Sequence, residues 1–170
     1  MDEPENAGLG GEPLANGADT ATSVGVVSQY IKDFSFENPN APAIYQVQAQ
    51  PAFDVQFNIG AAEVAPDIHE VTLKIDVRAQ MDTQVAFIVD LSYSGLFAVR
   101  NMPDEHLQPF LLGEAPRLLF PFARRVLADA VRDGGFPPLM LEPIDFNGLY
   151  YQQLEQAQGA GDPAGEIGQA

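Results

Sequence analysis

The chain of 170 residues contains no cysteine, and this absence excludes several kinds of site at once. Without thiols there is no disulfide bond, no thiolate metal site and no cysteine nucleophile. Tryptophan is also absent, although 11 Phe and 5 Tyr supply aromatic side chains. No apolar run approaches the roughly 20 residues that a helix needs to span a bilayer, so we expect no direct membrane insertion.

Basic residues are scarce as well. The 8 Lys and Arg stand against 24 Asp and Glu, which gives a formal net charge of -16. Such a surface repels phosphate backbones and anionic lipid, so nucleic acid is not an expected partner, whereas basic partners are attracted. Residues 1–10 have no apolar core of the kind found in signal peptides, and a cytoplasmic protein is the simplest interpretation.

The usual catalytic motifs are missing. The chain has no GxSxG, GxxxxGK[ST], GxGxxG or HExxH sequence. His69 and His106 have no partners at the spacing of a metal site or a triad, so we interpret them as ordinary surface or partly buried residues. Asp104 and Glu105 fit the acidic first turn that a helix dipole favours. We therefore expect that the protein is not an enzyme and that it binds no cofactor and no metal.

Alternation of apolar and polar side chains predicts four strands. It is clearest at residues 71–79 and 53–59, and residues 26–36 and 85–93 complete the set. A polar turn at residues 81–83 joins two of the strands so tightly that they should pair antiparallel. The sequence therefore predicts a four-stranded antiparallel sheet.

The strand at residues 85–93 departs from clean alternation. Ala86 and Ile88 are apolar on the face where Asp90 and Ser92 are polar. Either they are isolated surface aliphatic residues, which are common, or they belong to a contact surface on the outer face of the sheet. The sequence leaves both interpretations open.

Helices follow the predicted sheet. A start at residues 103–105 and a stop at Gly113 indicate a short first helix. Apolar residues follow helical spacing from residue 117 to 133, and glycine at 134 ends this helix. A last helix is expected at residues 145–156. The fold class is thus α+β.

The two ends differ from this central part in composition. Residues 1–24 are rich in Gly, Ala, Asp and Glu, and residues 157–170 are similar. Neither segment can bury enough apolar surface to offset the entropy of ordering, so both are expected to be disordered acidic tails. One domain, residues 25–156, lies between them. Its apolar and aromatic residues exceed what the predicted elements can cover, which indicates an oligomer interface or a binding groove.

Three sequence blocks stand out for their order and spacing. They are KDFSFENPNAP at residues 32–42, LFPFAR at 119–124, and GGFPPL at 134–139, followed by PIDF at 143–146. In an extended strand, the first block puts Phe34 and Phe36 on one face and its acidic residues on the other. Together the blocks resemble the SecB family of bacterial protein-export chaperones, over roughly residues 26–155.

The resemblance implies both a fold and an activity. SecB-type chaperones are homotetramers, built as dimers of dimers, and each subunit is an antiparallel sheet with helices packed on one face. They hold precursor proteins unfolded without ATP and deliver them to SecA, the export ATPase. The helix at residues 117–133 would then pack between dimers, and its contact residues would be Phe122, Val126 and Leu127.

Two binding surfaces are also implied by the resemblance. The first is a groove for unfolded segments, lined by Phe53, Val55, Phe57, Leu149 and Tyr150. The second is an acidic outer face that contacts SecA, with Asp33, Glu37, Ile88 and Asp90. Family members often use a charged C-terminal tail as a further SecA contact, but the segment after Gln156 has only Asp162 and Glu166 as charged side chains.

An alternative function is a SecB-like interaction module dedicated to one specific partner, such as a toxin–antitoxin pair. Competition between unrelated unfolded proteins would separate the two functions, because only a general chaperone binds them interchangeably. An enzyme with an unrecognised site is a third interpretation, which the missing motifs disfavour.

Overall fold

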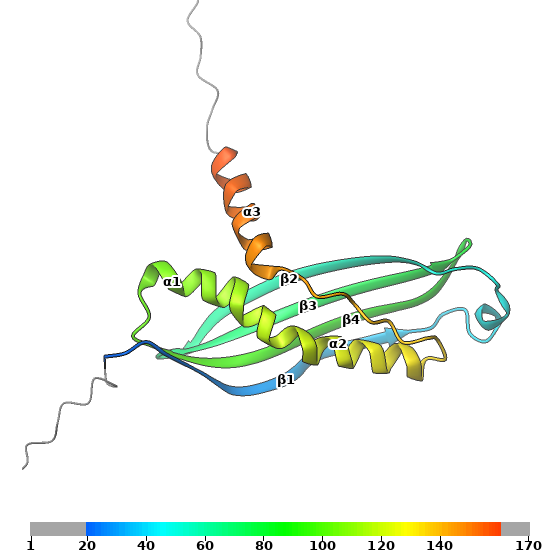
Figure 1. Cartoon of the computed structure of the whole chain (residues 1–170). Helices are drawn as coiled ribbons and strands as arrows, with labels where there is room; N and C mark the ends of the chain where they lie inside the picture. Colours follow the sequence, from blue (N-terminus) through cyan, green and yellow to red (C-terminus); the bar gives the residue numbers. More distant parts are fainter. Residues whose placement is uncertain (1–19, 161–170) are drawn as a thin grey trace, which may run out of the picture.

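A computed structural model describes residues 20–160, and they form a four-stranded antiparallel sheet with helices (Figure 1). The strands are β1 (Ser23–Glu37), β2 (Ala52–Ala65), β3 (Ile68–Met81) and β4 (Gln84–Arg100). Their order in the sheet is β1-β4-β3-β2, so β2, β3 and β4 form a meander and β1 returns beside β4. The predicted sheet is confirmed, but its strands are longer than the segments in which apolar and polar residues alternate.

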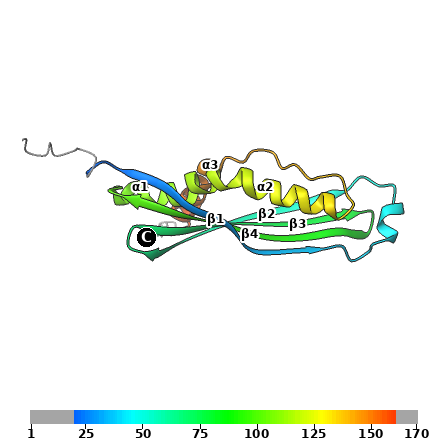
Figure 2. The same ribbon diagram turned by 90° about the horizontal axis from the view of Figure 1, so that it is seen from below.

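One long helical stretch follows β4 and lies along one face of the sheet (Figure 2). It consists of α1 (Asp104–Pro109), a π-helical turn η3 (Phe110–Glu114) and α2 (Ala115–Asp133). The last helix, α3 (Phe146–Gly159), projects away from this body as an arm (Figure 1). A short 3-10 helix, η2 (Ala43–Gln46), lies between β1 and β2. None of the helices within the described part of the chain is long and apolar enough to cross a membrane.

The core lies between α2 and the face of the sheet that it covers. Alternate residues of β3 and β4 are buried there, including Val71, Leu73, Ile75, Val77, Val89, Leu91 and Phe97. From α2, Leu119, Ala123 and Leu127 are completely buried, four residues apart as one helix face requires. Burial of each large aliphatic side chain contributes about 1.5–3 kcal/mol, so this layer holds helix and sheet together. The other face of the sheet, which we call the outer face, has no helix over it within residues 20–160 (Figure 2).

The sequence predicts a helix stop at Gly113, and this prediction is wrong. Gly113 is buried inside η3, and the helical stretch continues through it into α2. A Cβ atom at Gly113 would collide with the side chain of Asn147 in α3. The glycine therefore permits a close approach between two helices rather than a turn of the chain. The predicted end of α2 is confirmed, since Gly134 follows its last residue and donates its amide to the Ala130 carbonyl at 2.9 Å.

The predicted domain boundaries fall slightly inside the observed elements. β1 begins at Ser23, within the segment predicted as an N-terminal tail of residues 1–24, and Ser23 pairs with Arg100 of β4. α3 continues to Gly159, beyond the predicted boundary at residue 156. The rest of both predicted tails, residues 1–19 and 161–170, lies outside the described residues.

Candidate functional site

An apolar pocket of about 440 Å³ lies at the Phe53 end of β2. We call it the proximal pocket; its lining includes Phe53, Met81, Ala86, Phe87, Phe136 and Leu139. Phe53 is 45% exposed, although its ring centroid lies 6.2 Å from that of Phe87. Phe87 lies in turn 5.1 Å from Phe136. Rings that are packed on one side and open on the other can bury an apolar side chain of a partner.

The sequence prediction of groove residues omits Phe87, Phe136 and Leu139. Phe87 lies within a strand whose alternation indicates only core packing. Phe136 and Leu139 flank Pro137-Pro138 in the GGFPPL block, and the prolines keep this segment extended. An extended segment rich in apolar residues is the signal in the sequence that points to a wall of the pocket.

The break in alternation at Ala86 and Ile88 has two separate causes. Ala86 is the extra residue of a bulge in β4, and its side chain is completely buried beside Phe87 in the proximal pocket. Ile88 is half-buried on the outer face, directly opposite Glu37 of β1. Only Ile88 therefore belongs to an outer surface.

A smaller pocket of about 90 Å³ lies further along β2, where α3 leaves the body. We call it the distal pocket; its lining is Phe57, Asn58, Ile59, Leu112, Leu149, Tyr150 and Gln153. Phe57 is half-buried, with its ring centroid 6.2 Å from Phe146 and 6.5 Å from Phe120. Val55 lies between the two pockets on the same face of β2 and is half-buried. The five predicted groove residues thus follow one line from Phe53 to α3.

The outer face brings the four predicted acidic-face residues together. Glu37 of β1 is the cross-strand neighbour of Ile88 in β4, and Asp90 lies two residues further along the same face. Asp33 pairs with Ser92, the next outward position of β4. All three carboxylates are exposed. The three carboxylates form a row along β1 and β4 with Ile88 at one end, and Arg78 of β3 is the other cross-strand neighbour of Ile88.

Asp76 of β3 adds a carboxylate that the sequence does not single out. It lies directly opposite Asp90, and its Oδ1 atom is buried without a hydrogen-bond partner. The nearest cation is the Lys74 Nζ atom, at 3.9 Å. Burial, together with the neighbouring Asp90, raises the pKa of Asp76, because both disfavour the charged form. Strand alternation marks Asp76 only as outward, since the register that sets it against Asp90 depends on the folded sheet.

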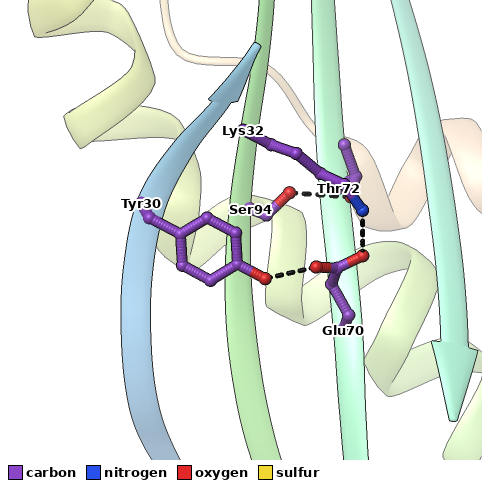
Figure 3. Close-up of polar contacts among 5 residues, drawn as sticks. All are labelled: Tyr30, Lys32, Glu70, Thr72 and Ser94. Carbon is purple, nitrogen blue, oxygen red and sulfur yellow. Dashed lines mark hydrogen bonds and ion pairs between the residues drawn. The ribbon is translucent and has the colours of Figure 1, made fainter. Parts of the chain in front are cut away.

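A polar network crosses the outer face from β1 over β4 to β3 (Figure 3). Lys32 donates from Nζ to Oε1 of Glu70 at 2.6 Å, and the Tyr30 hydroxyl donates to the other oxygen of Glu70. Ser94 of β4 is the cross-strand neighbour of both Tyr30 and Thr72, and its hydroxyl lies 2.8 Å from that of Thr72. Because Ser94 is small, the β1 side chains reach Glu70 above it. The network ties the edge strand β1 to the interior of the sheet.

Removing Glu70 should change the titration of Tyr30. The hydrogen bond to Glu70, with burial and the charge of Glu70, raises the pKa of Tyr30 to about 12. In Glu70→Ala we expect this pKa to fall towards the ordinary tyrosine value of about 10, as an ultraviolet titration of tyrosinate would show. Tyr30→Phe identifies the signal by removing it. A Tyr30 pKa that stays near 12 in Glu70→Ala would contradict the network.

The same network makes stability depend on pH in two directions. The hydrogen bonds from Lys32 and Tyr30 lower the pKa of Glu70, so its stabilising contribution is present at neutral pH and is lost as the pH falls through the lowered value. The raised pKa of Tyr30 makes stability depend on pH in the opposite direction. Its contribution is complete below about pH 10 and is lost as the pH rises towards 12.

The outward side of α2 differs from the expectation at one residue. Phe122 is 46% exposed, and Val126 is half-buried in a groove of about 470 Å³ between α2 and β1. Leu127 is completely buried against the sheet instead. Since it already packs within its own subunit, we remove it from the set of expected contacts between subunits, which leaves Phe122 and Val126.

Known proteins share the sequence and the fold of this chain. The family model described as SecB, preprotein translocase subunit SecB, matches residues 17–157. The chain belongs to the SecB family. It is 61% identical over 157 residues to protein-export protein SecB of Sphingopyxis alaskensis, covering 91% of each chain. It is 57% identical over 163 residues to protein-export protein SecB of Novosphingobium aromaticivorans, covering 95% of this chain and 94% of that one.

A solved structure shows the same fold. It is a SecB-like chaperone of Mycobacterium tuberculosis in complex with a peptide from the HigA1 antitoxin. The TM-score is 0.60, with 19% sequence identity, over 71% of this chain and 90% of that one. At this identity the similarity concerns the fold alone, and it confirms the α+β architecture expected from the SecB resemblance.

Proposed function

We propose that this protein is an ATP-independent chaperone of protein export, which holds precursor proteins unfolded and delivers them to the SecA ATPase. Membership of the SecB family and 61% identity to a protein-export protein SecB support the proposal. The observation that carries it is the line of apolar side chains along β2, with a pocket at each end. An unfolded precursor protein bound along this line is called a client.

The two pockets favour unfolded clients for a geometric reason. Phe53 and Phe57 are four residues apart on one strand, a distance of about 13 Å. An extended segment can place two apolar side chains at this spacing, whereas a folded protein keeps most such residues in its core. Burial of apolar surface is non-directional and contributes about 25 cal/mol per Å², so it does not require a particular client sequence.

The outer face is the proposed contact for SecA. Asp33, Glu37 and Asp90 lie along β1 and β4 on the same face as Ile88, and the groove residues lie on the opposite face of the sheet. A basic partner surface would be steered and oriented by the carboxylates. Because the two faces are separate, a client and SecA can bind one subunit together.

The remaining assignments belong to the same proposal. Phe122 and Val126 would contribute to contacts between the dimers of a homotetramer, and the site of action would be the cytoplasm. The proposal includes no catalytic step, cofactor or nucleic acid. Within residues 20–160, no cluster of three or more His, Asp or Glu side chains could hold a metal ion.

A refolding experiment tests the proposal. The purified protein is mixed with a chemically denatured precursor on dilution, without nucleotide, and the refolding of the precursor is followed. We expect slower refolding when the tetramer is near stoichiometric, because bound segments cannot enter the precursor core. The same precursor added after refolding should not bind. Unchanged refolding of several unrelated precursors would overturn the proposal.

A dedicated interaction module is the second candidate function. The SecB-like chaperone of similar fold was solved in complex with an antitoxin peptide, so a protein of this fold can bind a partner of that kind. Two unrelated denatured proteins should compete for one general chaperone. A module with one partner would bind that partner alone and show no such competition.

A further inference from the structure

The arm α3 is held to the subunit by its first turn. Phe146, its first residue, is buried between the rings of Phe57 and Phe120. Asp145 caps the helix by accepting a hydrogen bond from the Gly148 amide at 2.9 Å. All residues from 151 to 160 are exposed, and the helix projects away from the body (Figure 1). The arm is therefore fixed at one end.

The fixed end rests on the π-helical turn η3. Gly113 of η3 is buried, and any side chain larger than hydrogen at this position would meet the side chain of Asn147. The pKa of Glu114 is lowered mainly by hydrogen bonding from Arg117 and also by a hydrogen bond from Asn147. Asn147 is thus packed against Gly113 of η3 and lies near Glu114, the next residue. π-Helical turns inside longer helices frequently occur at functional sites.

The tilt of the arm determines the width of the distal pocket. One wall is Phe57 of β2, another is Leu149 and Tyr150 of α3, and Leu112 of η3 adds a further apolar side chain. Asn58 and Gln153 make part of the lining polar. Leu149 and Tyr150 follow Asn147 by two and three residues. A change of tilt at Asn147 therefore moves this wall relative to β2.

We propose that Gly113 and Asn147 are a positioning pair that seats α3 on η3 and so sets the distal pocket to accept a second apolar side chain of a client. This inference rests on the proposed function and deepens it. The proximal pocket binds one apolar side chain, and the seated arm lets the distal pocket bind another about four residues away. The pair thereby selects clients by the spacing of their apolar residues.

Two peptides test the selection. One carries a single Phe in a polar sequence, and the other carries a second Phe about four residues further along. We expect the original protein to bind the second peptide about tenfold more tightly, because partial burial of one more aromatic side chain is worth about that factor. Gly113→Leu should remove this difference while leaving affinity for the single-Phe peptide unchanged. Gly159→Leu, at an α3 position where a Cβ meets nothing within 4 Å, is the matched control.

The position of the arm is measured independently of peptide binding. The chain has no cysteine, so Gly60→Cys on β2 and Gln152→Cys on α3 provide a unique pair of spin-label sites. A Cβ at Gly60 meets nothing within 4 Å, and Gln152 is exposed. With excess unlabelled chain, so that each assembly contains one labelled chain, Gly113→Leu should shift and broaden the distance distribution. Gly159→Leu should not.

Asn147→Ala adds no bulk and keeps the test valid if Gly113→Leu does not fold. It should broaden the distance distribution and reduce the preference for the two-Phe peptide. A distance distribution unchanged in both variants, or equal weakening of both peptides, would overturn the positioning role. If the original protein binds neither peptide, the proposed chaperone function is wrong. The positioning of α3 by Gly113 and Asn147 is then tested by the label distance alone.

Discussion

Replacing Phe53 by Ser should weaken client capture about tenfold and lower the free energy of unfolding by about 1–2 kcal/mol, since just over half of the ring is buried. Phe53 is 45% exposed in the proximal pocket, so a client can bury the remaining ring surface, which contributes about 1–2 kcal/mol by area. The affinity for a denatured precursor and the thermal unfolding midpoint measure the two effects. Val64→Ser is the matched control, since Val64 is 55% exposed on the same strand but lines neither pocket.

Phe57→Ser should behave differently from Phe53→Ser. Phe57 is half-buried against Phe120 and Phe146, so its removal should destabilise the fold by about 2–4 kcal/mol and loosen the fixed end of α3. The single substitution at Phe53 is therefore the cleaner test of the groove. Equal loss of stability in the two variants would show that Phe53 is a core residue and that the groove assignment is wrong.

Reversing two charges on the outer face, by Asp33→Lys with Asp90→Lys, should weaken SecA binding by about 10- to 100-fold. Close charge pairs at an interface contribute on this scale, and the new lysines would repel a basic partner. Client affinity should be unchanged, because the groove is on the other face of the sheet. Binding isotherms for SecA and for a denatured precursor separate the two effects.

Glu105→Lys is the control for this prediction. Its side chain is 80% exposed in the first turn of α1, on the helix side of the sheet, and it reverses the sign of a carboxylate in the same way. We compare the logarithm of the loss in SecA affinity between the two variants. If it is half as large for Glu105→Lys as for the double variant, net charge accounts for the effect. A parallel loss of client binding in the double variant would also contradict the assignment of the outer face as the SecA contact.

The strands were predictable because their side chains alternate without ambiguity. In β3, five apolar residues from Val71 to Ala79 face the core and the residues between them face outward. This period fixes which face each residue occupies. The grouping of Asp33, Glu37 and Asp90 on one face follows from the same rule, once the SecB resemblance suggests that these residues act together.

The features that the sequence could not predict depend on contacts between distant segments. Gly113 has the appearance of a helix stop, and only the presence of Asn147 beside it explains why a residue without a side chain fits there. Ala86 is buried because a bulge shifts the pairing of β4 with β3. Leu127 and Phe122 both fit the helical pattern, but the direction of α2 over the sheet decides that Leu127 faces inward. Local periodicity contains no information on these pairings.

The connectivity of the sheet has a consequence for how the subunit assembles. β2, β3 and β4 are joined by two-residue turns, whereas Glu37 of β1 lies beside Ile88 of β4 with two whole strands between them in the chain. Loop-closure entropy must be overcome before such a distant pairing gains any contacts. The outer face combines residues of β1 and β4, so Asp33 and Glu37 reach their places beside Ile88 and Asp90 only after this long-range pairing has formed.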